Sequence, residues 1–406
     1  MNSIELEARW AARNYEPLPV VLTRGEGAFL WDENGRRYVD MMSAYSAVSH
    51  GHAHPRILAA LEAQARRLAV SSRAYHSDRL GPFLAKLCAV TGMDAALPMN
   101  TGAEAVETAI KAARRWGYRV KGIAPDRAEI IVAEGNFHGR TTTIVGFSSE
   151  PSYRDGFGPF TPGFRAVPFG DLDAARSAIT AETAAILVEP IQGEGGIIIP
   201  PEGYLAGLRR LCDEMGILLI FDEVQTGLGR TGRWFAFQHE DAMPDGLVLG
   251  KALGGGVLPV SAFAGKRALM DVFTPGSHGS TFGGNPLAAA VGLEALTVME
   301  EEGLVEKSRV LGERMMARLR AIESPVLKDV RGRGLLAGAE VDPRFASARL
   351  VAERLIEKGV LSKDTHDTVV RFAPPLVISE SVLISALDRF EEVLRDIERS
   401  HLRPAA

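Results

Sequence analysis

The stretch from residue 217 to residue 256 constrains the fold most, because it holds two short apolar runs that each lead into charged residues. The runs, ILLIF and GLVLG, are bounded by Gly, Pro or charge, which is typical of strands buried on both faces of a parallel sheet. Asp222 and Glu223 follow the first run, and Lys251 follows the second. Ligands bind at strand ends in open α/β sheets. We therefore expect a carboxylate and an amine to meet at one crevice.

Two interpretations of these charges are open from the residues alone. An amine desolvated by apolar walls has a lowered pKa and can form a Schiff base with a carbonyl. A nearby carboxylate can hold a proton on the ring nitrogen of pyridoxal phosphate, a cofactor that needs both groups. The alternative is a simple ion pair between Asp222 and Lys251 at the strand ends.

Composition limits the class of protein. At 406 residues the chain exceeds one ordinary core, so we expect two domains. A net charge of -5 and the lack of a Lys/Arg-rich run argue against a nucleic-acid partner. Cys88 and Cys212 lie in apolar stretches, as expected for reduced thiols. No apolar run has the length of a membrane span, and the first residues are acidic without a signal-peptide core, so we expect no membrane partner and a cytoplasmic location.

The order of patterns along the chain predicts an α/β fold. Residues 20–40 alternate apolar and polar side chains around Asn34-Gly35, which predicts a hairpin. From residue 55 onward, helical patterns alternate with short apolar runs, which indicates βαβ units and a mostly parallel central sheet. The expected helices are 4–14, 55–70, 78–90, 102–119, 203–216, 304–322, 348–358 and one from Ser379; the expected strands are ALPM, EIIVA, AAILVEP, ILLIFDEV, GLVLG, VSAFAG, LLAGAEV and TVVRFAP.

These elements predict a large domain over residues 51–305 and a smaller α+β domain built from both chain ends. The N-terminal segment 1–50 joins the C-terminal segment 306–406 in the smaller domain, because the hairpin has no other obvious partner.

Three further patterns could mark ligand sites. Residues 98–105, PMNTGAEA, begin a helix whose free N–H groups can bind phosphate. Residues 227–232, GLGRTG, match the dinucleotide fingerprint, but aromatics and helix breakers follow them instead of a long helix, so we expect no dinucleotide there. GLVLGK lacks one residue of a P-loop. The alternating His50, His52 and His54 indicate a turn, and we expect no metal.

Long motifs in the same order resemble the class III (subgroup II) pyridoxal-phosphate aminotransferases. These motifs are MNTGAEAVETAIKAARRWGY, GNFHGRT, FDEVQTGLGRTGRWFAFQ, LGKALGGG and HGSTFGGNPLAAA. The resemblance covers nearly the whole chain and implies fold type I, the aspartate aminotransferase fold. Five other segments are most similar to the branch that acts on ornithine: NYEPLPVVLTRGEGAFLWD, SAYSAVSHGHAHP, DGFGPFTPGF, VEPIQGEGG and RFAPPLVIS. The implied reaction converts L-ornithine and 2-oxoglutarate to glutamate 5-semialdehyde and glutamate by a ping-pong route.

The resemblance implies roles for the cofactor-binding residues. Lys251 would carry the cofactor covalently and move the substrate proton, and Asp222 would pair with the pyridinium nitrogen. Gln225 would contact the phenolic oxygen, and Phe137 would stack on the ring. The phosphate would be bound by Thr101, Gly102 and Ala103 and, from the neighbouring subunit of a homodimer, by Ser280 and Thr281.

The resemblance also implies how two different substrates share one site. Arg371 would bind the α-carboxylate of glutamate and 2-oxoglutarate, and Glu194 would mask that arginine when ornithine binds. Arg140 would hold the distal carboxylate. Tyr15 and Tyr45 would orient the α-amino end of ornithine.

Other activities on the same scaffold remain alternatives. His138 stands where the acetylornithine enzymes of the family often have histidine, whereas Tyr45 favours ornithine. The first alternative is an aminotransferase for acetylornithine or 4-aminobutyrate. More distant ones are an aminomutase, a decarboxylase and a cofactor-binding protein without activity.

Overall fold

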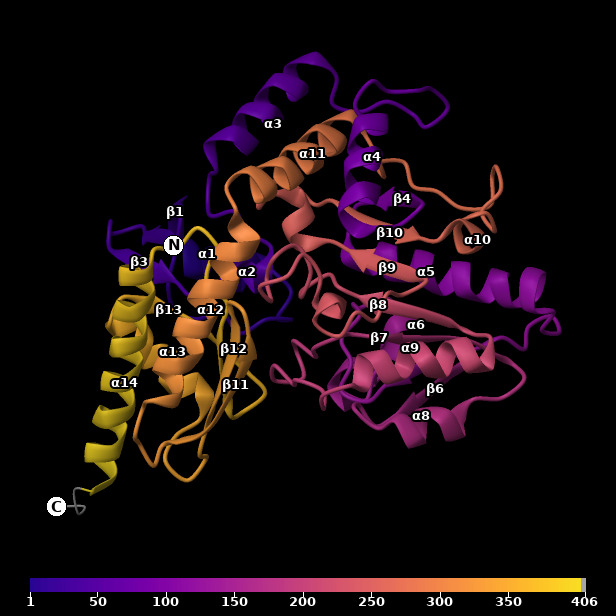
Figure 1. The fold of residues 1–406 in the computed structure, drawn as a ribbon. Helices are drawn as coiled ribbons and strands as arrows, with labels where there is room; N and C mark the ends of the chain where they lie inside the picture. Colours follow the sequence, from indigo (N-terminus) through magenta and orange to yellow (C-terminus); the bar gives the residue numbers. More distant parts are fainter. Residues whose placement is uncertain (403–406) are drawn as a thin grey trace.

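The computed structural model describes residues 1–402, and its centre is a seven-stranded sheet (Figure 1). The strand order is β4-β10-β9-β8-β7-β5-β6. The strands are β4 Ala95–Met99, β5 Glu129–Ala133, β6 Phe164–Val167, β7 Thr183–Val188, β8 Leu218–Asp222, β9 Gly246–Leu249 and β10 Ser261–Gly265. Only β10 runs antiparallel, to both β4 and β9. The carboxyl ends of the other six strands therefore lie at one edge of the sheet.

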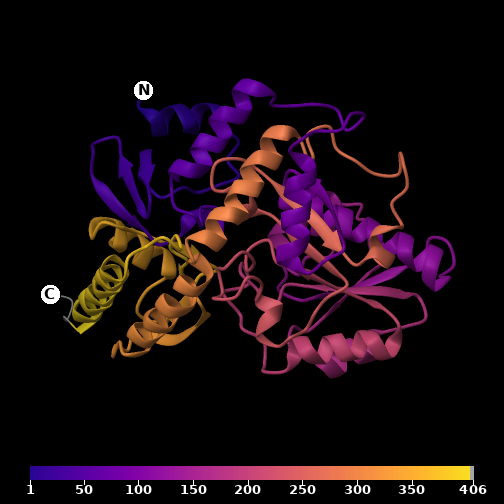
Figure 2. The same ribbon diagram turned by 45° about the horizontal axis from the view of Figure 1, so that its top comes forward.

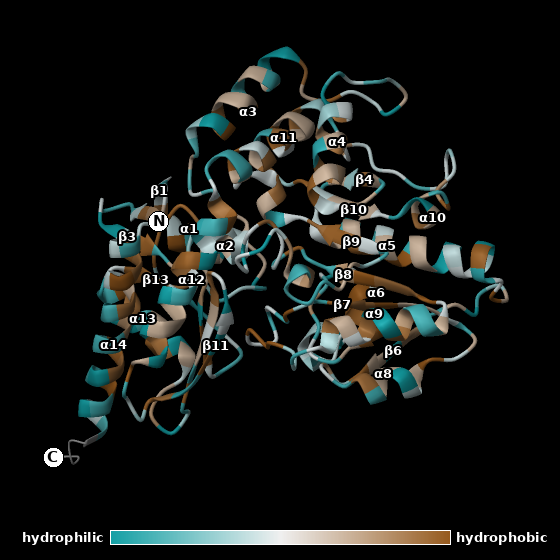
Figure 3. Ribbon diagram, in the orientation of Figure 1, coloured by the Kyte–Doolittle hydropathy of each residue, from teal (hydrophilic) through white to brown (hydrophobic). Residues whose placement is uncertain are grey.

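Alternate residues of the central strands enter two separate hydrophobic cores, one on each face of the sheet. On β7, Ile186 and Val188 belong to one cluster, while Ala185 and Leu187 belong to the other. All six residues of β7 and all five of β8 are buried, because helices cover both faces. Figure 3 shows these strands as largely hydrophobic. The fully apolar runs thus folded into inner strands, as their composition predicts.

Helices on the two faces of the sheet supply the remaining walls of this part of the molecule. Helix α5 packs on β9 and β10, α9 packs on β8, and α11 packs against both α3 and α4. The long helices here are α3 Pro55–Arg67, α4 Leu80–Thr91, α5 Gly102–Trp116, α9 Tyr204–Met215 and α11 Pro286–Glu301. Short helices are α1 Ser3–Trp10, α2 Ser43–Ser46, α6 Thr142–Gly146, α7 Pro151–Arg154, α8 Leu172–Ala178 and α10 Arg267–Met270; single turns are η1 Gly117–Lys121, η2 Ala236–His239 and η3 Lys251–Gly254.

The two ends of the chain meet in one of two further, four-stranded sheets. In the first, β3 pairs in parallel with β13, with Val39 opposite Val360. The second has the order β11-β12-β15-β14. The strands are β1 Leu22–Glu26, β2 Phe29–Asp32, β3 Arg37–Asp40, β11 Leu327–Arg333, β12 Leu336–Val341, β13 Val360–Leu361, β14 Lys363–Thr365 and β15 Val369–Phe372, and the helices are α12 Leu304–Arg320, α13 Ala348–Glu357 and α14 Glu380–Leu402. Figures 1 and 2 show the N-terminal strands beside these C-terminal elements.

We propose a division into a large domain, 51–305, and a small domain from 1–50 and 306–406. The pairing of β3 with β13 supports it, because it joins strands from the two chain ends. Residues 403–406 of this division lie outside the described part of the chain.

Several boundaries differ from those expected. The hairpin at Asn34-Gly35 forms as predicted between β2 and β3. The expected helix 102–119 ends at Trp116 and continues as the π turn η1, and the helix expected at 4–14 covers only Ser3–Trp10. The sequence has no recognisable strand pattern at β6 or β11, because the residues of these strands are mostly partly exposed and mixed in polarity. Among residues 1–402, no helix combines the length and apolarity that crossing a bilayer requires.

Candidate active site

A cavity of about 200 Å³ opens at the carboxyl edge of the central sheet. Residues just after β4, β5, β7, β8 and β9 line it, because parallel strands deliver their following loops to the same edge. Seven of the residues singled out from the sequence line this cavity: Gly102, Ala103, Phe137, Glu194, Asp222, Gln225 and Lys251.

Lys251 presents a reactive amine to this cavity. It follows β9, begins the turn η3, and has a left-handed backbone with φ 45°. Desolvation lowers the pKa of the amine to about 8, with Glu194 acting in the opposite direction and Arg371 reinforcing the decrease. Within residues 1–402 its Nζ has no hydrogen bond or ion pair, so the simple ion pair with Asp222 does not form. A substantial neutral fraction near neutral pH makes this amine a nucleophile and a base.

Asp222 pairs instead with a histidine. Its Oδ2 lies 2.7 Å from Nδ1 of His138, and its Oδ1 accepts the N–H of Val224 at 3.0 Å. Burial opposes protonation of His138, but the hydrogen bond and charge of Asp222, together with Glu189, raise its pKa. The carboxylate is therefore held in place at the end of β8 by a histidine whose pKa it raises.

Two functional candidates in this cavity were not among the residues selected from the sequence. His138 was considered only as a marker of substrate type, although its position next to Phe137 in GNFHGRT was a usable signal. Glu189 is buried at the end of β7, and burial raises its pKa to about 7. It accepts the N–H groups of Phe137 and Gly193, at 3.0 and 3.3 Å, so it fixes the loop that carries Phe137.

An arginine with spare hydrogen-bonding capacity lies on the sheet of C-terminal strands. Arg371, on β15, is fully buried, and its Nη1 donates to Glu194 Oε1 at 2.8 Å. Burial favours the neutral acid, but Arg371 outweighs it and lowers the pKa of Glu194 to about 2. The Nε and Nη2 of Arg371 are buried without a partner among the described residues. They can bind an added carboxylate. The ring of Tyr45 lies 5.1 Å from this guanidinium.

The start of α5 can bind a phosphate group. Thr101 caps the helix, and a capping box with Glu104 uses the N–H groups of both residues. Gly102 and Ala103 are the first helical residues, so their N–H groups have no acceptor within the helix. A Cβ added to Gly102 would lie 3.1 Å from Val224, so the glycine keeps the cavity wall close.

The remaining residues lie outside this cavity in the single chain. Arg140 is exposed and stacks on Tyr153, 3.6 Å from its ring centroid. Tyr15 is 82% exposed. Ser280 accepts a hydrogen bond from Asn100 of the same chain at 2.9 Å, and Thr281 is exposed.

These groups fit pyridoxal phosphate. The cavity combines an amine for covalent attachment, a carboxylate for the ring nitrogen and a helix start for phosphate. Gln225 adds a buried Oε1 without a partner among the described residues. A Cβ on Gly193 would lie 1.4 Å from that oxygen, so only glycine leaves room for the Gln225 side chain.

The histidines at 50–54 and the GLGRTG segment lie outside this cavity. His50, His52 and His54 have separate partners: Ala295 O, Asp40 and Glu302. The described part of the chain has no cluster of three His, Cys, Asp or Glu residues suited to a metal. No long helix follows GLGRTG, only the short turn η2.

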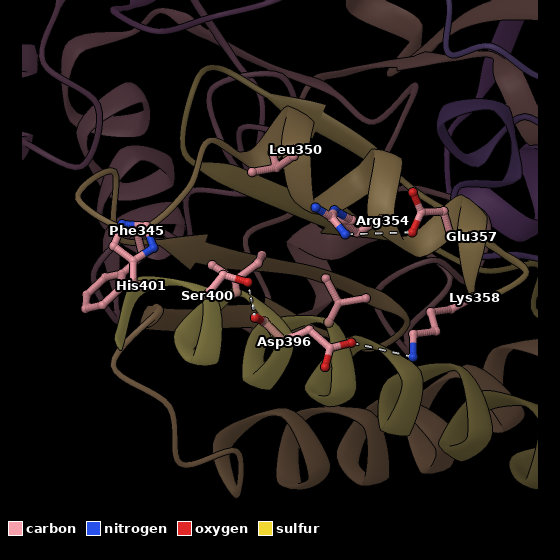
Figure 4. Close-up of a pocket in the computed structure, with 10 residues that line it drawn as sticks. Phe345, Leu350, Arg354, Glu357, Lys358, Asp396, Ser400 and His401 are labelled. Atoms are coloured by element: carbon pink, nitrogen blue, oxygen red, sulfur yellow. Dashed lines mark hydrogen bonds and ion pairs between the residues drawn. The ribbon is translucent and has the colours of Figure 1, made fainter. Parts of the chain in front are cut away.

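A second concavity, of about 160 Å³, lies between α13 and α14 (Figure 4). Its charged side chains pair with each other, Arg354 with Glu357 and Lys358 with Asp396. The ring of His401, which also lines it, packs against Phe345 with 5.2 Å between the ring centroids.

Comparisons with known proteins agree with this geometry. A model of the class-III aminotransferase family matches residues 10–394. The ornithine aminotransferase of Brevibacillus brevis is 53% identical over 395 residues, covering 97% of this chain and 98% of its relative. A solved structure of the ornithine aminotransferase from Toxoplasma gondii has partial occupancy of PLP at its active site. It superposes on this protein with a TM-score of 0.97 at 44% identity, and the match covers 98% of this chain and 95% of the Toxoplasma chain. The acetylornithine aminotransferase of Elizabethkingia anophelis is also 44% identical, with a TM-score of 0.88 and coverage of 97% and 98%. The chain belongs to the class-III aminotransferase family.

Proposed function

We propose that this protein is a pyridoxal-phosphate-dependent ornithine 5-aminotransferase. It would transfer the terminal amine of L-ornithine to 2-oxoglutarate and yield glutamate 5-semialdehyde and glutamate. The observation that carries the proposal is the ion pair, 2.8 Å long, between the buried Arg371 and Glu194, which lines the same cavity as Lys251.

The cofactor, when bound, supplies an aldehyde that accepts the substrate amine and a ring that withdraws electrons from the substrate carbon. Lys251 would attach it covalently, and its Nζ would then take and return the proton of the amine-bearing carbon. Asp222 would hold the proton of the ring nitrogen, and His138 would keep Asp222 oriented. Gln225 and Phe137 would contact the ring, and Thr101, Gly102 and Ala103 would hold the phosphate.

Glu194 allows one site to accept two different substrates. With ornithine, the closed pair neutralises Arg371, and Tyr45 and Tyr15 would receive the amino-acid end. With 2-oxoglutarate or glutamate, Glu194 would move away and Arg371 would bind the α-carboxylate through its free N–H groups. Arg140 would hold the distal carboxylate.

We also propose that the active unit is a homodimer in the cytoplasm. Ser280 and Thr281 do not line the cavity of their own chain, and the exposed Thr281 is available to complete the phosphate site of a second copy. The two free cysteines support a reducing compartment.

The deciding experiment compares kcat/KM for L-ornithine and N-acetylornithine with 2-oxoglutarate as acceptor. We expect a clear preference for ornithine, because acetylation removes the charged amine that Tyr45 and Tyr15 would orient. A preference for the acetylated substrate, in line with the likeness to the Elizabethkingia enzyme, would replace the assignment. Turnover without 2-oxoglutarate would indicate an aminomutase or decarboxylase.

A further inference from the structure

Arg230 lies in the GLGRTG segment, outside the cavity around Lys251, and its side chain is fully buried. Left-handed backbone at Leu228 and Gly229, with φ 53° and 84°, makes the tight turn before it. Among the described residues Arg230 forms no ion pair, and burial lowers its pKa to about 9. A buried guanidinium without a carboxylate is tolerated only where hydrogen bonds compensate for lost water.

Four acceptors from three distant segments provide those bonds. Nη1 donates to Leu335 O at 2.8 Å and to Pro374 O at 2.6 Å. Nη2 donates to Ser43 Oγ at 3.1 Å and to Ser49 Oγ at 3.0 Å. The planar fork of arginine can reach all four at once, which the single ammonium of lysine cannot.

The two serines hold an unusual turn. Four consecutive non-glycine residues, Ser43 to Ser46, have left-handed backbone with φ 44°, 46°, 58° and 73°. L-residues normally visit this region singly, so the turn needs external support. Ser43 Oγ donates to Ala373 O at 2.6 Å, and Ser49 Oγ donates to Ser46 O at 3.0 Å. Arg230 thus bonds to both side chains that fasten this turn.

The turn and the segment bound by Arg230 carry two substrate-binding candidates. Tyr45 is the third residue of the turn, and its ring lies 5.1 Å from the guanidinium of Arg371. Pro374, whose carbonyl Arg230 binds, is three residues after Arg371. One side chain therefore ties the Tyr45 turn to the chain just beyond Arg371.

We propose that Arg230 is a positioning residue that sets the placement of Tyr45 against Arg371 and thereby the selectivity for the amino-acid end of the substrate. This rests on the proposed ornithine function. Without the guanidinium, the left-handed turn loses support on both serines and relaxes, which moves Tyr45 away from the substrate.

The test is a double-mutant cycle between Arg230→Gln and Tyr45→Ala in the reconstituted holoenzyme. Arg230→Gln should raise KM for L-ornithine about tenfold and change kcat less than about threefold, because Lys251 and Asp222 are untouched. The visible absorbance of the bound cofactor should remain. In the Tyr45→Ala background, Arg230→Gln should raise KM for L-ornithine by less than about twofold. Ala44→Gly, which favours left-handed backbone, should partly restore KM in the Arg230→Gln protein.

Ser308→Ala is the matched control, because the buried Ser308 Oγ donates to the backbone of Arg230 but does not touch the turn. It should leave KM unchanged. If Arg230→Gln does not fold, Ser43→Ala tests the same contact in the same cycle. If the effect of Arg230→Gln or of Ser43→Ala on KM simply multiplies with that of Tyr45→Ala, the two sites act independently and the proposal is overturned. If the wild type instead prefers another terminal amine, the ornithine assignment fails, while a non-additive cycle with that substrate still supports Arg230.

Discussion

Arg371 Nη1 lies 2.8 Å from Glu194 Oε1, although the two residues are 177 positions apart in the chain. The pair leaves two nitrogens of the arginine buried and unpartnered among the described residues. Under the proposed function, Glu194 neutralises Arg371 until a substrate carboxylate replaces it, and this proposal predicts how substitutions redistribute the activity.

Glu194→Ala should shift ornithine transamination from the terminal amine toward the α-amine. The uncovered guanidinium would bind the α-carboxylate and place the α-amine at Lys251, and a charge-assisted bidentate pair can change the product ratio by about tenfold or more. The two carbonyl products can be quantified after a single turnover. Glu202→Ala, an exposed acid, is the control. An unchanged product ratio would refute the masking role.

Lys251→Ala should lose both the visible absorbance of the covalently bound cofactor and turnover, with kcat reduced by about a thousandfold or more. Alanine can neither attach the cofactor nor move the substrate proton. Absorption spectra and steady-state assays check this, with the exposed Lys328→Ala as control. Steady-state turnover comparable to wild type would contradict the assignment of Lys251.

His138→Phe should weaken protonation of the cofactor ring nitrogen. His138 Nδ1 lies 2.7 Å from Asp222 Oδ2, and phenylalanine removes that partner while filling a similar volume. We expect kcat to fall about tenfold, less than in Asp222→Asn, because the carboxylate itself remains. NMR of ¹⁵N-labelled cofactor would report the protonation state. If the protonation state of the ring nitrogen is the same in His138→Phe as in the wild type, Asp222 holds that proton without help from His138.

The apoprotein should capture pyridoxal phosphate faster as the pH rises toward 8. Desolvation lowers the pKa of Lys251 to about 8, so the neutral amine increases about tenfold per pH unit below that value and then levels off. Stopped-flow absorbance against pH gives the midpoint. A midpoint near the ordinary lysine value of 10.5 would contradict the desolvated environment.

The same lowered pKa affects the stability of the apoprotein. The unfolded chain keeps the Lys251 proton up to about pH 10.5, while the folded chain releases it near 8, so stability should rise with pH between these values. Comparison with Lys251→Met isolates this contribution, because methionine does not titrate. If the denaturant midpoints of the wild type and of Lys251→Met depend on pH in the same way, Lys251 makes no such contribution to stability.

Much of the fold follows from local patterns. The apolar runs ILLIF and GLVLG became buried parallel strands, because only a strand covered on both faces can hide every side chain. Asp222 and Lys251 follow those strands, and parallel strands end at one edge, so their presence in one cavity was predictable. The edge strand β6 and the polar strand β11 were not, since neither has a clear periodicity.

The sequence by itself determined the type of sheet, the edge that carries the chemistry and the amine and acid placed there, because strand period and chain direction are local properties. Only the tertiary structure decided that Asp222 pairs with His138 and not with Lys251, and that Arg230 donates to Ser43 in the left-handed turn that carries Tyr45. These contacts join segments 84 and 187 residues apart. Their geometry depends on how segments far apart in the chain pack together, which no local pattern specifies.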